Sequence, residues 1–203
     1  MSDDSALTLR ARRRLETETA IRDAALELFL EQGPQETTAD QIAALAGVST
    51  RTFFRYFDTK ESAALPGLGW VQDRFEASAA SIHGARDVIP VLNRLFLDAV
   101  TDLEETESIR TRKFFRLLST DAVMREAAGA RDAYLEQWLV QRLSELLPEE
   151  DGLELRLLVA AGVSQSRTVW AYWYELDQDE DSATVTLSQL FSRASQILAR
   201  GIR

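Results

Sequence analysis

The sequence predicts an all-α protein. Alternation of apolar and polar residues, the pattern of a half-buried strand, is almost absent from the 203 residues, whereas apolar residues recur at the spacing of amphipathic helices. Four prolines and two acidic clusters interrupt otherwise helix-like sequence and mark the ends of helices. We therefore expect helices throughout, with short breaks between them.

The first helix is predicted over residues 10–31. Its apolar side chains recur three and four residues apart, as on one face of an amphipathic helix, at Ile21, Ala24, Ala25, Leu28 and Phe29. Gln-Gly-Pro at 32–34 ends it, because proline cannot continue the helix.

Three short helices are predicted next. The second follows Thr38 and stops at Gly47, where a left-handed cap is expected. Ser49 caps the third, which covers about 50–57 and is basic and aromatic. The fourth opens at Lys60 and runs into Pro66. The rest of the chain predicts helices near 70–82, 87–103, 107–118, 121–147, 153–174 and 186–202.

Composition excludes several classes of protein. The formal net charge of −10 excludes a polybasic protein held to nucleic acid or anionic lipid by bulk attraction, so any DNA contact needs a local patch. The absence of cysteine excludes disulfide scaffolds and thiolate zinc sites. No uncharged run is longer than the eleven residues of 62–72, which is too short to span a membrane, and no apolar stretch follows the N-terminal arginines as in a secretory signal. We expect a cytoplasmic protein without membrane contact.

Enzymatic and metal sites are not predicted. His83 is the only histidine, so neither a two-histidine metal site nor a Ser-His-Asp array with a spare imidazole can be built. Asp177, Asp179 and Asp181 match the first positions of a calcium loop, but serines replace the glycine and the bidentate glutamate which that loop requires. A solvated acidic turn is expected there. We expect no enzymatic activity, no metal and no cofactor.

The second and third helices, joined by Ala-Gly-Val-Ser, match a helix-turn-helix. Such a unit presents the N-terminal side chains of its second helix to the major groove, while Phe53 and Phe57 point inward. The side chains so presented are Thr50, Arg51, Thr52 and Arg55. The amides beside Thr38 and Ser49, together with Lys60, are predicted phosphate contacts. An ordinary helical hairpin with a solvated polar face is the alternative.

These residues resemble the DNA-binding signature of the tetracycline-repressor (TetR) family of bacterial regulators. The resemblance covers about 21–61 and rests on three runs and a pair: Thr-Thr-Ala-Asp-Gln-Ile-Ala from Thr37, Ala-Gly-Val-Ser from Ala46, Thr-Phe-Phe-Arg-Tyr-Phe from Thr52, and Lys60-Glu61. It implies a two-fold dimer that binds palindromic operators, usually represses, and is released by a small ligand in its C-terminal domain.

Three departures from the family pattern affect what the resemblance implies. Phe54 stands where the family often has a phosphate-binding tyrosine, which leaves Tyr56 as the expected phosphate contact. Arg51 replaces a small residue, and an arginine there can contact guanine O6 and N7, which favours a G·C pair in each half-site. Pro66-Gly67 interrupts the helix that links head and ligand domain in the family, so the path of the signal is left open.

Arginines at the N-terminal end of the first helix resemble the basic arms that some such proteins lay along phosphates or in a minor groove. Arg12, Arg13 and Arg14 are the candidates, and a solvated helix start is the alternative.

The later helices hold most of the aromatic residues, which are either plain core or partly the lining of a ligand cavity. Trp138, Trp170 and Trp173 are the candidate lining of a site for an unidentified apolar or aromatic small-molecule effector.

A helical stripe on the last helix is the candidate homodimer interface. Small residues at 160–166 on the preceding helix would let helices of two subunits approach closely. The alternative is that both stripes face their own core. The stripe consists of Leu187, Leu190, Phe191, Ala194, Ile197 and Leu198.

The sequence therefore predicts a helix-turn-helix DNA-binding domain over 10–60 and a helical ligand-binding and dimerisation domain over 61–203. Its expected function is that of a ligand-responsive transcriptional regulator, a repressor that binds double-stranded palindromic operator DNA. The alternative is a helical small-molecule-binding or protein-interaction scaffold that has lost DNA binding. The operator sequence and the identity of the effector are left open.

Overall fold

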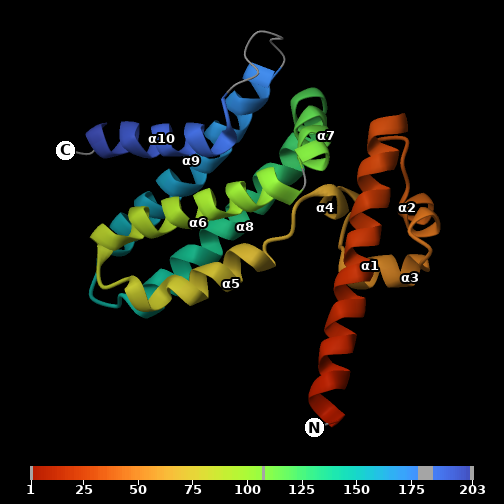
Figure 1. Ribbon diagram of the computed structural model, residues 1–203, viewed down its shortest axis with the longest axis horizontal. Helices are drawn as coiled ribbons and strands as arrows, with labels where there is room; N and C mark the ends of the chain where they lie inside the picture. The colour runs from red at the N-terminus through yellow and green to blue at the C-terminus, as the bar shows by residue number, and fades with distance from the viewer. Residues whose placement is uncertain (1, 107, 178–184, 202–203) are drawn as a thin grey trace. The chain divides into compact units, whose positions relative to one another are not determined.

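The chain folds into α-helices that form two compact units (Figure 1). The computed structural model describes residues 2–106, 108–177 and 185–201, and this part of the chain contains helices and no strand, as predicted. One unit comprises Met1–Pro66 and Leu117–Ala128, and the other comprises Gly67–Arg116 and Gly129–Arg203. We call them the N-terminal and the C-terminal unit.

Four helices form most of the N-terminal unit: α1 (Ser2–Gln32), α2 (Ala39–Leu45), α3 (Thr50–Tyr56) and α4 (Lys60–Ala64). α1 begins earlier than predicted, because no proline or glycine interrupts residues 2–32. Its predicted apolar face is confirmed at four of five positions. Leu28 is only half-buried, and Leu26 is buried in its place.

Arg22 ties α1 to the end of α4. Its guanidinium pairs with Glu18, donates to the Leu65 carbonyl oxygen, and lies 4.8 Å from the centroid of the Phe57 ring. One side chain thus contacts three segments of the N-terminal unit, which fixes α4 against α1.

The predicted break at Pro66 is confirmed. α4 ends after five residues, and Leu65 has extended backbone, the conformation that a following proline favours. The next helix, α5 (Gly69–Ser78), belongs to the C-terminal unit, so one of the boundaries between the units falls at this break.

The remaining helices match their predicted positions to within a few residues. After α5 comes a short 3₁₀ turn at Ala79–Ser81. The exposed His83 then lies in a loop before Gly84, as expected. The later helices are α6 (Ala85–Thr106), α7 (Ser108–Thr120), α8 (Ala122–Leu146), α9 (Gly152–Asp177) and α10 (Leu187–Gly201). No helix in the described part of the chain has the length and apolar character needed to cross a bilayer.

The core of the C-terminal unit is built around a close contact between α6 and α9. A Cβ atom added at Gly162 would lie 2.8 Å from the Leu92 Cδ1 atom, closer than two carbons approach without a shift. The small residue at this position therefore serves packing within one chain. For the small residues at 160–166, the alternative was that they face the core of their own chain. Gly162 does so, which corrects the expectation that the whole run faces a second subunit.

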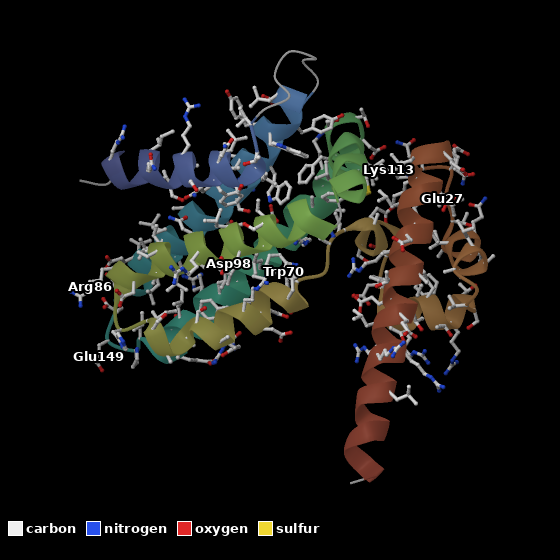
Figure 2. All side chains as sticks on the ribbon, viewed as in Figure 1. Glu27, Trp70, Arg86, Asp98, Lys113 and Glu149 are labelled. Atoms are coloured by element: carbon white, nitrogen blue, oxygen red, sulfur yellow. The ribbon has the colours of Figure 1, made fainter. Side chains whose placement is uncertain are left out.

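Polar contacts hold the outer helices of this unit together. Arg142 on α8 makes a two-pronged ion pair with Glu76 on α5, with N–O distances of 2.7 and 2.9 Å, and its hydrogen bond lowers the pKa of Glu76. Glu150 accepts a hydrogen bond from the first amide of α6, at Ala85. Figure 2 shows Arg86 and Glu149 at this same end of the unit, where α6 begins and α8 turns into α9.

The predicted dimer stripe on α10 is corrected by the structure. Leu187, Leu190 and Phe191 are buried in the core of their own chain, and the Phe191 ring packs on Phe96 of α6 at 6.5 Å between centroids. Ala194 and Leu198 are half-buried, and Ile197 is exposed. Half of the stripe therefore faces inward, because α10 packs on both α6 and α9.

Candidate DNA-binding site

A tight turn joins α2 and α3. Gly47 has a φ of 69°, in the left-handed region that glycine adopts without strain. The amides of Gly47 and Val48 donate to the carbonyls of Ala44 and Ala43, which closes the end of α2. This geometry is that of the predicted helix-turn-helix.

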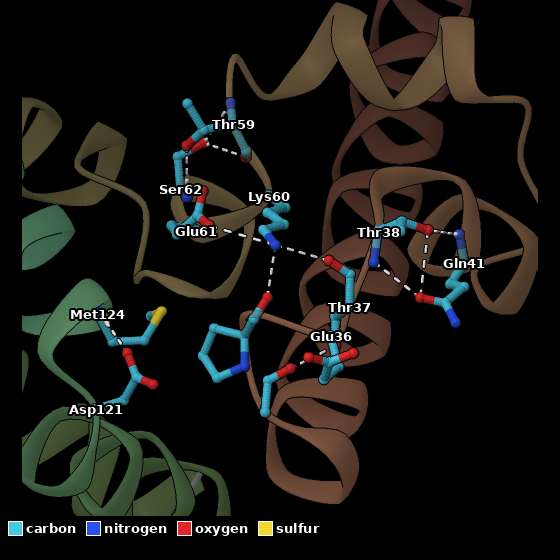
Figure 3. Close-up of polar contacts among 12 residues, drawn as sticks. Glu36, Thr37, Thr38, Gln41, Thr59, Lys60, Glu61, Ser62, Asp121 and Met124 are labelled. Atoms are coloured by element: carbon cyan, nitrogen blue, oxygen red, sulfur yellow. Dashed lines mark hydrogen bonds and ion pairs between the residues drawn. The ribbon is translucent and has the colours of Figure 1, made fainter.

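Side-chain caps hold the starts of both helices. Thr38 forms a capping box with Gln41 at the start of α2 (Figure 3). Ser49 accepts a hydrogen bond from the amide of Thr52 at the start of α3. The cap at Ser49 was predicted, and the two caps place exposed hydroxyl residues at the helix N-termini, where anions are favoured.

A hydrogen bond that the sequence did not indicate crosses between the two helices. The Thr50 hydroxyl donates to Asp40 Oδ1 at 2.5 Å, which joins the first turn of α3 to the first turn of α2. Thr50 is half-buried, so its hydroxyl is engaged within the protein. Spacing along the chain could not reveal this contact, because the two residues meet only after the turn has formed.

The remaining predicted base-reading residues lie on α3. Arg51 and Arg55 are exposed and Thr52 is half-buried. The Arg55 guanidinium lies 5.3 Å from the centroid of the Tyr56 ring, within cation-π range. The two arginines are four residues apart, which places them on neighbouring turns of one helix face. This is the positive local patch that an acidic protein needs for DNA contact.

Two phenylalanines anchor α3 from beneath, as predicted. Phe53 is 0% exposed and Phe57 is 6% exposed, and their ring centroids lie 5.9 Å apart. Phe54, next to Phe53, is 53% exposed, and Tyr56 is half-buried. Burial of Phe53 and Phe57, which are four residues apart on one side of the helix, fixes which face of α3 is turned outward.

Lys60 has a contact that its predicted role did not include. Its ammonium donates to the Pro34 carbonyl at 2.6 Å and to the Thr37 carbonyl at 2.8 Å (Figure 3). Both acceptors lie in the loop between α1 and α2. In the structure the Lys60 ammonium is hydrogen-bonded within the protein, and its contact with phosphate stays a prediction.

The predicted N-terminal arm is corrected. Arg12, Arg13 and Arg14 are exposed but lie within α1, and Arg12 pairs with Glu16 one turn later at 2.9 Å. No helix-breaking residue separates these arginines from the rest of α1. They therefore lie on the surface of a helix, where a free arm was expected.

The three candidate tryptophans of the ligand site do not form one cluster. Trp138 packs edge-on against Phe75, at 5.5 Å between ring centroids. Trp170 stacks on Phe115 of α7 at 4.6 Å, and Trp173 lies 6.3 Å from Trp170. All three tryptophans are partly buried against the core. We call Phe115, Trp170 and Trp173 the aromatic cluster.

Polar groups are buried in the same unit. Among the described residues, Asn93 Oδ1 on α6 and Gln165 Oε1 on α9 are buried side-chain oxygens without a hydrogen-bond partner. Burial also raises the pKa of Asp132 on α8, against the lowering effect of Arg131 and Arg167. These groups are candidate partners for a ligand with hydrogen-bonding atoms.

A metal site is not found in the described part of the chain, where no group of three or more histidine or acidic residues could hold an ion. Of the three aspartates of the calcium-like pattern, Asp179 and Asp181 lie outside the described residues, and Asp177 ends α9.

The fold and the capped helix pair define a helix-turn-helix DNA-binding protein. A family model described as bacterial regulatory proteins of the tetR family matches residues 21–62, from within α1 into α4. The N-terminal helices therefore match the DNA-binding domain of this family, and the chain is a DNA-binding transcriptional regulator.

Relatives of this class extend the similarity over most of the chain. The transcriptional regulator TcmR of Streptomyces glaucescens is 29% identical over 87% of this chain and 82% of its own length. The structure of NalD, the secondary repressor of a multidrug efflux pump in Pseudomonas aeruginosa, is similar with a TM-score of 0.56 at 21% identity, covering 93% of this chain and 96% of NalD.

A third relative was solved with a ligand. FadR of Bacillus subtilis, in complex with stearoyl-CoA, has a TM-score of 0.53 at 20% identity, over 91% of this chain and 99% of FadR. At these identities the two solved structures establish the shared fold.

Proposed function

We propose that this regulator is a repressor that reads a palindromic operator with α3 and leaves it when a small molecule binds the C-terminal unit. The exposed pair Arg51 and Arg55 carries the proposal. Both arginines project from a helix that is capped at Ser49 and anchored by Phe53, so their position is fixed before DNA arrives. Because the partner is genomic DNA, we place its action in the cytoplasm.

The operator can be found without knowing the gene it controls. We expect the wild-type protein to select a two-fold symmetric duplex from a random-sequence library, with half-sites about one helical turn apart. We call it the selected duplex. Failure to enrich any sequence would leave the scaffold interpretation, in which DNA binding has been lost.

Replacing Arg51 by alanine tests base reading. Arg51→Ala should weaken binding to the selected duplex by about 1–3 kcal/mol and hardly change binding to random duplexes, because only a base-edge contact carries sequence information. Fluorescence anisotropy on both duplexes measures this difference. Equal loss on both would assign Arg51 to the phosphates.

A homodimer would place two such helices on one duplex. Of the interface predicted on α10, Ile197 remains exposed, and α9, which packs on α10, adds the exposed Leu153 and Leu157. Large exposed apolar side chains on neighbouring helices support a partner surface there. The proposed interface therefore uses the outward faces of α9 and α10.

The effector is proposed to be an aromatic or apolar molecule with a hydrogen-bond donor. The aromatic cluster supplies flat apolar surface from α7 and α9, and the unpaired oxygens of Asn93 and Gln165 supply acceptors in the same unit. The acyl-CoA of the FadR structure belongs to that protein, and the aromatic cluster of this chain supports a flat ring compound.

A panel of hydroxylated aromatic compounds, with 1-naphthol first, tests the effector class. A binding compound should raise the melting temperature and weaken binding to the selected duplex, and by linkage the duplex should weaken the compound by the same factor. Trp170→Ala should abolish both effects. Trp138→Ala is the matched control, because Trp138 lies outside the aromatic cluster and should leave both effects in place.

A further inference from the structure

The side chain of Lys60 connects α4 to the loop that precedes the helix-turn-helix. Lys60 is the first residue of α4, and its ammonium reaches back to the carbonyls of Pro34 and Thr37, at 2.6 and 2.8 Å. A charged donor makes stronger hydrogen bonds to carbonyls than a neutral one. The side chain is only 26% exposed, so these bonds are partly shielded from water.

The loop that Lys60 holds is itself fixed by a chain of hydrogen bonds. Thr37 is buried, and its hydroxyl donates to the Gly33 carbonyl at 2.8 Å and accepts from Gln32 Nε2 at 3.1 Å. Gly33 has a φ of 86°, which lets the chain reverse after α1. The end of α1, the loop and the start of α4 thus form one bonded assembly.

This assembly leads directly into the DNA-reading helices. Thr38, the cap of α2, follows Thr37 in the chain, and Asp40 in the first turn of α2 accepts from Thr50 at the start of α3. A shift at the Thr37 carbonyl would therefore reach α3 through two consecutive connections. Lys60 lies at the other end of this path, on α4.

We infer that Lys60 is a positioning residue for the recognition helix, which sets the place of α2 and α3 by holding the Pro34 and Thr37 carbonyls. This replaces the phosphate contact expected from the sequence. Two of the three N–H bonds of the ammonium point into the loop, where a phosphate would have to compete with both carbonyls. The inference rests on the proposed operator recognition.

The two roles predict different salt dependence. A lost phosphate contact lowers the slope of log K against log salt by about 0.9 and weakens all duplexes alike. A lost positioning contact leaves random-duplex binding and its slope unchanged, because non-specific binding needs charge and tolerates a displaced helix. The selected duplex alone then weakens, because base contacts need the exact placement of Arg51 and its neighbours.

Lys60→Met removes the ammonium and keeps most of the stem. We expect its affinity for the selected duplex to fall about tenfold or more, with random-duplex affinity within about twofold of wild type and an unchanged salt slope there. Lys60→Arg should restore most of the specific affinity, because its fork can also donate to both carbonyls. Lys113→Met is the matched control, since Lys113 is the other lysine of the chain, is exposed and lies in the C-terminal unit.

The outcomes separate the inference from the proposed function. If wild-type protein enriches no duplex, operator recognition fails. If it does, and Lys60→Met weakens both duplexes equally with a lower slope, the positioning role alone is overturned. The positioning role is also overturned if Lys60→Met and Lys113→Met bind every duplex with the same affinity. Melting curves and stoichiometric titration show whether a loss reflects unfolded protein.

A measurement on the wild-type protein tests the same inference and does not depend on whether the variants fold. With ¹⁵N-labelled lysine the chain gives two side-chain ammonium signals, because it contains two lysines. The Lys60 signal should exchange slowly with water and show couplings to the Pro34 and Thr37 carbonyl carbons, both free and on the selected duplex. Exchange as fast as that of Lys113, or a coupling to phosphorus when DNA is added, would overturn the inference.

Discussion

Phe191→Asp is expected to unfold the C-terminal unit. Phe191 is 1% exposed and packs on Phe96 in the core that α6, α9 and α10 share. Loss of the ring costs about 3–5 kcal/mol, and a buried carboxylate without a partner adds to this cost. Urea denaturation followed by circular dichroism should show most of the cooperative transition of this unit lost.

Ile197→Asp is the matched control on the same helix. Ile197 is 58% exposed, so an aspartate there stays hydrated and the protomer should keep its stability. If the outward face of α10 forms the proposed dimer, sedimentation of Ile197→Asp should show folded monomers. A folded and dimeric Phe191→Asp protein would contradict the packing of α10, and a dimeric Ile197→Asp protein would move the interface elsewhere.

Phe53→Ala should destabilise the N-terminal unit by about 3–5 kcal/mol, because it removes a large side chain from a fully buried site. Phe53 is 0% exposed and contacts the rings of Phe54 and Phe57, so the cavity would lie directly beneath the recognition helix. Thermal unfolding measures the loss, and binding to both selected and random duplexes should fall to the extent that the N-terminal unit is unfolded.

The neighbouring residue supplies the comparison. Phe54 is 53% exposed, so Phe54→Ala should change stability by about 0.5 kcal/mol or less. The two variants remove the same group one position apart. Equal destabilisation by both would show that α3 is rotated relative to the arrangement described above.

The sequence by itself determined the helices and the helix-turn-helix, because these depend on neighbours in the chain. Helix spacing, the cap Ser49, the left-handed Gly47 and the stop at Pro66 act within a few residues, and the structure confirms each of them. The inward positions of Phe53 and Phe57 follow from the same local periodicity.

Only the tertiary structure decided which neighbours these elements meet. The α10 stripe is apolar whether it faces its own core or a second subunit, and the packing of α10 on α6 and α9 turned Leu187, Leu190 and Phe191 inward. The contact of Phe115 with Trp170 and the separation of Trp138 from both depend on how α7, α8 and α9 pack.

Lys60 shows the physical reason most clearly. As a lysine at the start of a helix beside a DNA-reading motif, it is equally suited to a phosphate and to a carbonyl, and no local rule separates the two. Its acceptors, Pro34 and Thr37, are more than twenty residues away in the chain and reach it only when α1 and α4 pack together. Contacts between distant residues depend on the whole fold, so periodicity and capping rules cannot predict them.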